Sequence, residues 1–88
     1  MIRIVCSAID PGDALTAATA LRDRIHPPGT SVLGPAPLFR LRGKARSQLV
    51  LKSTERRASI AAVGAAVEAV GPDAAKRGVS VSVDVDPQ

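Results

Sequence analysis

The sequence carries a row of basic residues at alternate positions, which continues into polar residues of the same register. The row consists of Arg40, Arg42, Lys44, Arg46, Gln48 and Lys52. Seven of the twelve basic residues lie between positions 40 and 57, where Glu55 is the only acid. Residues two apart on an extended strand lie on the same side about 6.6–6.8 Å apart, so four cations would span about 20 Å. Such a row matches a row of phosphates and predicts salt-dependent binding to a nucleic-acid backbone.

Other features of the same segment bear on this interpretation. Gly43 is expected to interrupt the row with a turn. A charged strand can also protect a sheet edge against aggregation, and the sequence leaves this alternative open. The only aromatic residue, Phe39, falls in the register of the apolar Leu49 and Leu51, so we expect it in the core. With no aromatic residue on the open sheet face, we expect contacts to the backbone of the nucleic acid and no stacking on its bases.

Residue types suited to catalysis are scarce. The chain has one His, one Cys and neither Tyr nor Trp, and it contains no phosphate-binding loop and no His or Cys pair at metal-ligand spacing. Asp84 and Asp86 lie two residues apart, but without a third ligand they favour cross-strand pairing with Arg3 over a cation site. We therefore expect no catalytic residue, no metal site and no cofactor in this chain.

Length and composition indicate one domain with a thin core. The 88 residues are 45% hydrophobic, largely through Ala and Val, and the net charge is +4. No apolar run approaches the roughly 18–20 residues that span a bilayer, so no membrane contact is expected. The single cysteine, Cys6, lies in an apolar register and can form no internal disulfide, which favours a core position and a cytoplasmic setting.

Local patterns predict a strand and a helix in the first third of the chain. Alternation over residues 2–8 predicts a strand whose even-numbered residues share an apolar face. Asp10 is a favoured N-cap, and it predicts a helix that runs to about His26 with Leu15 in its apolar stripe. The Pro-Pro-Gly sequence at 27–29 should end this helix.

The remaining elements are predicted from similar patterns. Residues 30–33 predict a short strand that breaks at the Gly-Pro-Ala-Pro sequence of 34–37, or that lies at a sheet edge. Residues 53–55 predict the start of a second helix, which Gly and Pro at 71–72 should end. Strict alternation over residues 79–86 predicts a strand with its valines facing the core.

The predicted order is β-α-β-β-α-β, so we expect an α+β fold of the ferredoxin-like type. Right-handed crossovers place both helices on one face of a four-stranded antiparallel sheet, with the first and third strands in its centre. The opposite face is expected to be open and polar.

Three segments resemble the C-terminal domain of the replication-restart helicase PriA (primosomal protein N′). They are residues 33–38 (LGPAPL), 40–52 (RLRGKARSQLVLK) and 84–88 (DVDPQ). The resemblance covers nearly the whole chain and implies that residues 1–88 are one non-catalytic domain of a larger ATP-dependent 3′-5′ DNA helicase. ATP and zinc would then bind only to other domains of that protein.

The resemblance also implies partners and a site. The partners are forked or single-stranded DNA, the acidic tail of single-stranded DNA-binding protein, and the remaining domains of the helicase, in a monomeric, nucleoid-associated protein. Lys44, Arg46 and Gln48 match the family motif and would form the shared site, supported by Arg40, Arg42 and Lys52. This chain has Ala45 and Ser47 where the family often has aromatic residues, and Lys44 where it has arginine.

Two other hypotheses remain open from the sequence. The domain could be an intramolecular scaffold that packs against the helicase core and binds neither DNA nor an acidic peptide. It could also be a regulatory ferredoxin-like domain that binds a small molecule and dimerises through its sheet.

Overall fold

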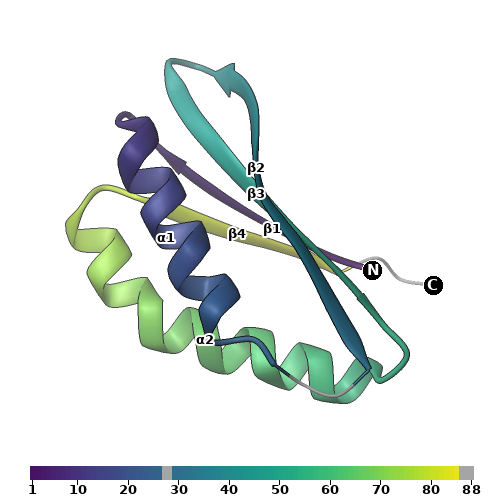
Figure 1. Cartoon of the computed structure of the whole chain (residues 1–88). Coiled ribbons are helices and arrows are strands. Elements are labelled where there is room, and N and C mark those ends of the chain that lie inside the picture. The colour runs from purple at the N-terminus through teal and green to yellow at the C-terminus, as the bar shows by residue number, and fades with distance from the viewer. Residues whose placement is uncertain (27–28, 86–88) are drawn as a thin grey trace.

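The computed structural model describes residues 1–26 and 29–85 and shows an α+β sandwich (Figure 1). The elements are β1 (Ile2–Ala8), α1 (Pro11–Asp23), β2 (Thr30–Leu41), β3 (Lys44–Ser53), α2 (Arg56–Lys76) and β4 (Ser80–Val85). The strands form one antiparallel sheet in the order β2-β3-β1-β4, and both helices cover the same face. The predicted ferredoxin-like fold, with the first and third strands in the centre, is therefore confirmed.

The core lies between the helices and the central strands. The even-numbered residues of β1 are buried, as predicted, with Ile4 and Cys6 fully so. Leu49 and Leu51 of β3 extend this layer, and Leu21 of α1 packs on it. Alanines fill three of the four buried positions of α1 and two of the five of α2, and their small side chains let the helices lie close to the sheet.

Helix α1 begins as predicted but ends earlier. The side chain of Asp10 accepts a hydrogen bond of 2.7 Å from the backbone N–H of Gly12, which confirms the N-cap. The helix ends at Asp23 rather than near His26. Leu15 is 50% exposed, so its place in the buried stripe was wrong. The predicted stop at the two prolines lies outside the described residues.

Strand β2 continues through the segment where a break was predicted. It lies at the edge of the sheet, which is where prolines can be tolerated, because the edge needs no second row of N–H donors. Two bulges absorb the irregularity, between Leu33 and Ala36 and between Leu38 and Leu41. Each bulge inserts one extra residue opposite β3 and so changes which face the following side chains occupy.

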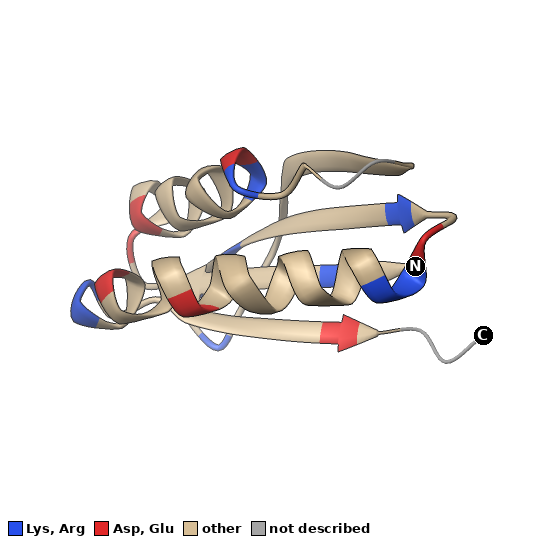
Figure 2. Cartoon of the chain, turned by 90° about the horizontal axis from the view of Figure 1, so that it is seen from below, with Lys and Arg blue, Asp and Glu red and all other residues tan. Residues whose placement is uncertain are grey.

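Helix α2 runs through Pro72 to Lys76, so the predicted end at Gly71 and Pro72 was wrong. The last turn buries Ala74, and the following Val79 is also buried and donates its N–H to the Ala74 carbonyl at 2.9 Å. This packing outweighs the low helix propensity of proline. The charged residues of both helices lie mainly toward their ends (Figure 2). Among the described residues, neither helix combines the length and apolar character needed to cross a bilayer.

The open face of the sheet is less polar than predicted. Arg3 lies between Val50 and Asp84 in the strand register, which confirms the predicted opposition of Arg3 and Asp84, whereas Asp86 lies outside the described residues. Val5 and Val50 also lie on this face and are half-buried there. The open face therefore has apolar as well as charged positions. Val83 of β4 pairs with Ile4 and so lies on the helix-covered face, as predicted, but it is 41% exposed there.

Candidate nucleic-acid interface

Four of the predicted site residues come together at the end of the β2–β3 hairpin. We call this group the basic tip, and it comprises Arg40, Arg42, Lys44 and Arg46. The chain reverses between Leu41 and Lys44, which are paired in the register. The extended row of about 20 Å predicted from the alternation was therefore wrong, because the turn folds the basic residues back on one another.

The turn that gathers these residues has two residues, Arg42 and Gly43. Their φ angles are +54° and +78°. Positive φ at both positions is what a tight type I′ hairpin turn requires, because its twist matches that of the flanking strands. Glycine adopts this conformation freely, whereas arginine does so at a cost. The predicted turn at Gly43 is confirmed.

Two guanidinium groups of the basic tip brace the hairpin. Arg40 Nη1 donates a hydrogen bond of 2.9 Å to the carbonyl of Gly43, and Arg46 Nε donates one of 3.0 Å to the carbonyl of Phe39. An arginine side chain has five N–H donors, so each retains donors for a bound anion. The two arginines are thereby positioned while their charge stays available.

The charge of the basic tip is not neutralised within the part of the chain that the structure describes. None of its four cations forms an ion pair there, whereas elsewhere Arg22 pairs with Asp23 at 3.4 Å and Arg77 with Asp73 at 3.6 Å. Closely spaced like charges repel one another and raise the local potential, so an anion bound among them gains energy from all four. The arrangement suits a phosphate backbone or a carboxylate.

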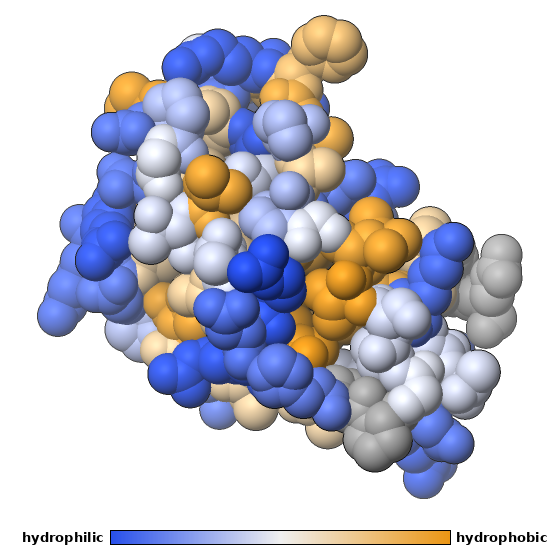
Figure 3. All heavy atoms as spheres, viewed as in Figure 1, coloured by the Kyte–Doolittle hydropathy of each residue, from blue (hydrophilic) through white to orange (hydrophobic). Residues whose placement is uncertain are grey.

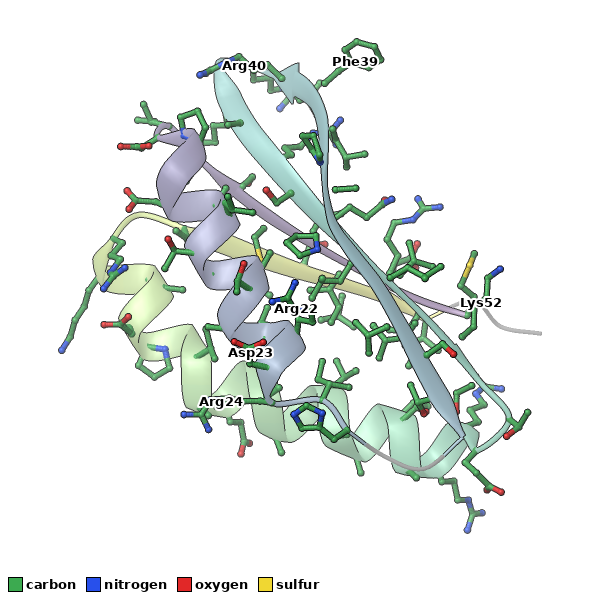
Figure 4. All side chains as sticks on the ribbon, viewed as in Figure 1. Arg22, Asp23, Arg24, Phe39, Arg40 and Lys52 are labelled. Atoms are coloured by element: carbon green, nitrogen blue, oxygen red, sulfur yellow. The ribbon has the colours of Figure 1, made fainter. Side chains whose placement is uncertain are left out.

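The other two predicted site residues lie outside the basic tip. Gln48 lies in the middle of the open sheet face, opposite Ala36 on β2 and Val5 on β1. Lys52 is eight residues along β3 from Lys44, a distance of about 27 Å in a strand. Figure 4 shows Lys52 at the opposite end of the hairpin from Arg40. The structure does not bring these six residues into one site.

Phe39 occupies a place that the sequence analysis did not predict. It is 93% exposed rather than buried in the core. The bulge between Leu38 and Leu41 breaks the alternation on which that prediction depended, and the hairpin here extends beyond the ends of the helices. In the space-filling view a hydrophobic side chain projects among hydrophilic ones at this end (Figure 3), and Figure 4 labels it as Phe39. Because side chains alternate along a strand, the apolar residues at 38, 39 and 41 cannot all lie on one face. This was the sequence signal that one of them would lie outside the core.

An apolar hollow of about 340 Å³ adjoins the basic tip. It lies between the start of α1 and the hairpin and is lined by Pro11, Leu15, Pro37, Leu38, Arg40, Ala45, Arg46 and Ser47. Ala45 and Ser47 are buried, and they are the two positions at which this chain has small residues where the family that it resembles often has aromatic ones. Small side chains at these positions leave the hollow open beside two arginines.

The single thiol of the chain is poorly suited to act as a nucleophile. Burial raises the pKa of the Cys6 thiol from 9.0 to about 11, so the thiol stays protonated near neutral pH and is a poor nucleophile. Over residues 1–26 and 29–85, no cluster of three His, Cys, Asp or Glu side chains could hold a metal ion. Cys6 is a core residue, as predicted.

The fold and the basic tip together define a small ferredoxin-like α+β domain with a cationic hairpin. The chain belongs to the family described as the primosomal protein N C-terminal domain, whose model matches residues 1–88, the whole chain. This confirms the resemblance found in the sequence and connects the chain with primosome assembly and replication restart. No curated protein matches the chain.

Proposed function

We propose that this chain is a non-catalytic domain that binds the backbone of branched or single-stranded DNA during replication restart. The observation that supports this function best is the basic tip, whose four cations lie together without an ion pair among the described residues. Each phosphate contact releases a counterion, so affinity should fall steeply as salt rises. Family membership supplies the cellular context.

A second partner is the acidic tail of single-stranded DNA-binding protein. The hollow beside the basic tip favours it, because Arg40 and Arg46 at its rim suit an acidic peptide that ends in a carboxylate. Lys44 stands where the family has arginine, whose planar guanidinium can donate two parallel hydrogen bonds to one carboxylate. This chain therefore has one bidentate donor fewer than the family pattern. We propose that DNA is the main ligand and that the peptide competes with it.

The test is the affinity of the isolated chain for a fluorescently labelled DNA fork, measured by anisotropy. We expect the Lys44→Glu/Arg46→Glu variant to bind at least tenfold more weakly, because two phosphate contacts become repulsions. The matched control is Arg24→Glu/Arg57→Glu, which makes the same change in charge at two exposed residues outside the hairpin. We expect the control to change affinity less than threefold.

Three outcomes would contradict the proposal. One is a wild-type chain that does not bind the fork at low salt. Another is equal loss in the two double variants, which would mean that only net charge matters. A third is a tip variant that binds as tightly as the wild type. Circular dichroism should verify that both double variants fold, since Arg46 also braces the carbonyl of Phe39.

A further inference from the structure

The hairpin presents the only aromatic side chain of the protein to solvent. Phe39 is 93% exposed, although burial of an aromatic ring is a large source of stability in a small domain. The other aromatic types are absent, and apart from Cys6 the buried core consists of aliphatic side chains. A ring held outside the core contributes nothing to packing, so its position calls for an interaction with something other than this chain.

The ring is held at a defined place among cations. Phe39 and Arg40 lie in the bulge between Leu38, which pairs with Arg46, and Leu41, which pairs with Lys44. The Phe39 carbonyl accepts the hydrogen bond from Arg46 Nε, which fixes the backbone from which the ring projects. Figure 4 shows the ring directed away from the sheet and the helices. The ring is thus accessible beside groups that can hold phosphates.

We propose that Phe39 stacks on an unpaired base of single-stranded DNA while the basic tip holds the flanking phosphates. The proposal rests on the function proposed above and adds the feature of DNA that the hairpin recognises. Aromatic side chains in a cationic groove bind single strands in this way without reading sequence. Bases in an intact duplex already stack on both faces, so a single projecting ring gains little from duplex DNA. The hairpin should therefore prefer single strands and the unpaired bases of a junction.

The exposed position of Phe39 revises the expectation that this chain contacts only the backbone of the nucleic acid. The aromatic residue was assigned to the core, which removed the only candidate for stacking. The structure instead places it where stacking is sterically possible.

The test compares substitutions of Phe39 on single-stranded and duplex oligonucleotides of equal length. We expect Phe39→Leu to bind the single strand about tenfold more weakly, because leucine keeps the hydrophobicity but loses the flat ring. Phe39→Trp should bind at least as well as the wild type. Duplex affinity should change less than twofold in both. Leu33→Ala is the matched control, since Leu33 is an exposed apolar residue of β2 away from the tip, and we expect it to bind as the wild type does.

The chain has neither Trp nor Tyr, so Phe39→Trp also supplies a clean fluorescence signal. We expect its emission to be quenched when the single strand binds. An oligonucleotide with abasic sites throughout its binding segment should remove both the quenching and the difference between the wild type and Phe39→Leu.

The outcomes separate this proposal from the function on which it rests. If Phe39→Leu binds the single strand as the wild type does while Lys44→Glu/Arg46→Glu fails to bind, stacking is overturned and backbone binding stands. If Phe39→Leu weakens binding of an acidic peptide but not of the oligonucleotide, the ring serves a protein partner and the proposal is also overturned. If the tip charges have no effect, the proposed function itself fails.

Discussion

Arg42 stands at a turn position with a φ of +54°, a conformation that side chains with a Cβ atom generally avoid. Asparagine at this position would fit the turn better, since Asn-Gly is a favoured type I′ sequence. An arginine retained at such a site contributes its charge to the basic tip at some expense in stability. The residue therefore links local backbone strain to the proposed binding surface.

This link can be tested with Arg42→Asn. We expect the free energy of unfolding to rise by about 0.5–1 kcal/mol, because the strain at the turn is relieved. We also expect affinity for the DNA fork to fall severalfold, because one cation is lost. Urea denaturation and anisotropy measure the two effects. A variant that gained no stability and lost no affinity would refute this account of Arg42.

At the scale of the elements, the regular strands and the start of α1 could be predicted from the sequence. The alternation of Ile2 to Ala8 and the cap at Asp10 are local patterns, and both are confirmed. The hairpin could not be predicted in detail, because a bulge changes the side-chain register without a clear sequence signal. For that reason Phe39 was assigned to the wrong face. The continuation of α2 through Pro72 depends on the packing of Ala74 in the core. This is a tertiary contact, and local helix propensity cannot predict it.

Gly34 illustrates how the first bulge of β2 constrains the sequence. Its φ is +107°, and a Cβ atom added there would lie 2.5 Å from the backbone oxygen of Gln48. We expect Gly34→Ala to lower the free energy of unfolding by about 2 kcal/mol or more, because both the φ angle and the contact are unfavourable. Chemical denaturation provides the measurement.

Gly64 is the matched control for this substitution. It lies within α2, and an added Cβ would meet nothing within 4 Å. Gly64→Ala should stabilise the chain by about 0.5–1 kcal/mol, because alanine is the better helix former. Equal effects of the two substitutions would mean that the bulge does not require glycine.

At the scale of the whole molecule, the net charge of +4 does not show that the positive charge is concentrated in one place. The domain measures about 35 × 24 × 18 Å, and four of its cations gather at one end of the hairpin. Elsewhere Arg22 and Arg77 each pair with a neighbouring aspartate. The alternation predicted six site residues along one extended row, but the turn at Arg42 and Gly43 decides which of them lie together. Gln48 and Lys52 lie on the same strand as Lys44 and Arg46 but outside the basic tip.

The alternative at this scale is a scaffold domain whose basic residues serve an interface within a larger protein. Such a domain, isolated, would bind neither DNA nor an acidic peptide. The two accounts therefore differ in what the purified chain does alone, and a binding measurement on that chain separates them.

The most direct test is the salt dependence of affinity for single-stranded DNA. With four phosphate contacts, the plot of log affinity against log salt should have a slope of about −3 for the wild type and for Arg24→Glu/Arg57→Glu. Lys44→Glu/Arg46→Glu should flatten the slope to about −1.5. A slope near zero in the wild type, or an unchanged slope in the tip variant, would contradict the claim that the basic tip binds the DNA backbone.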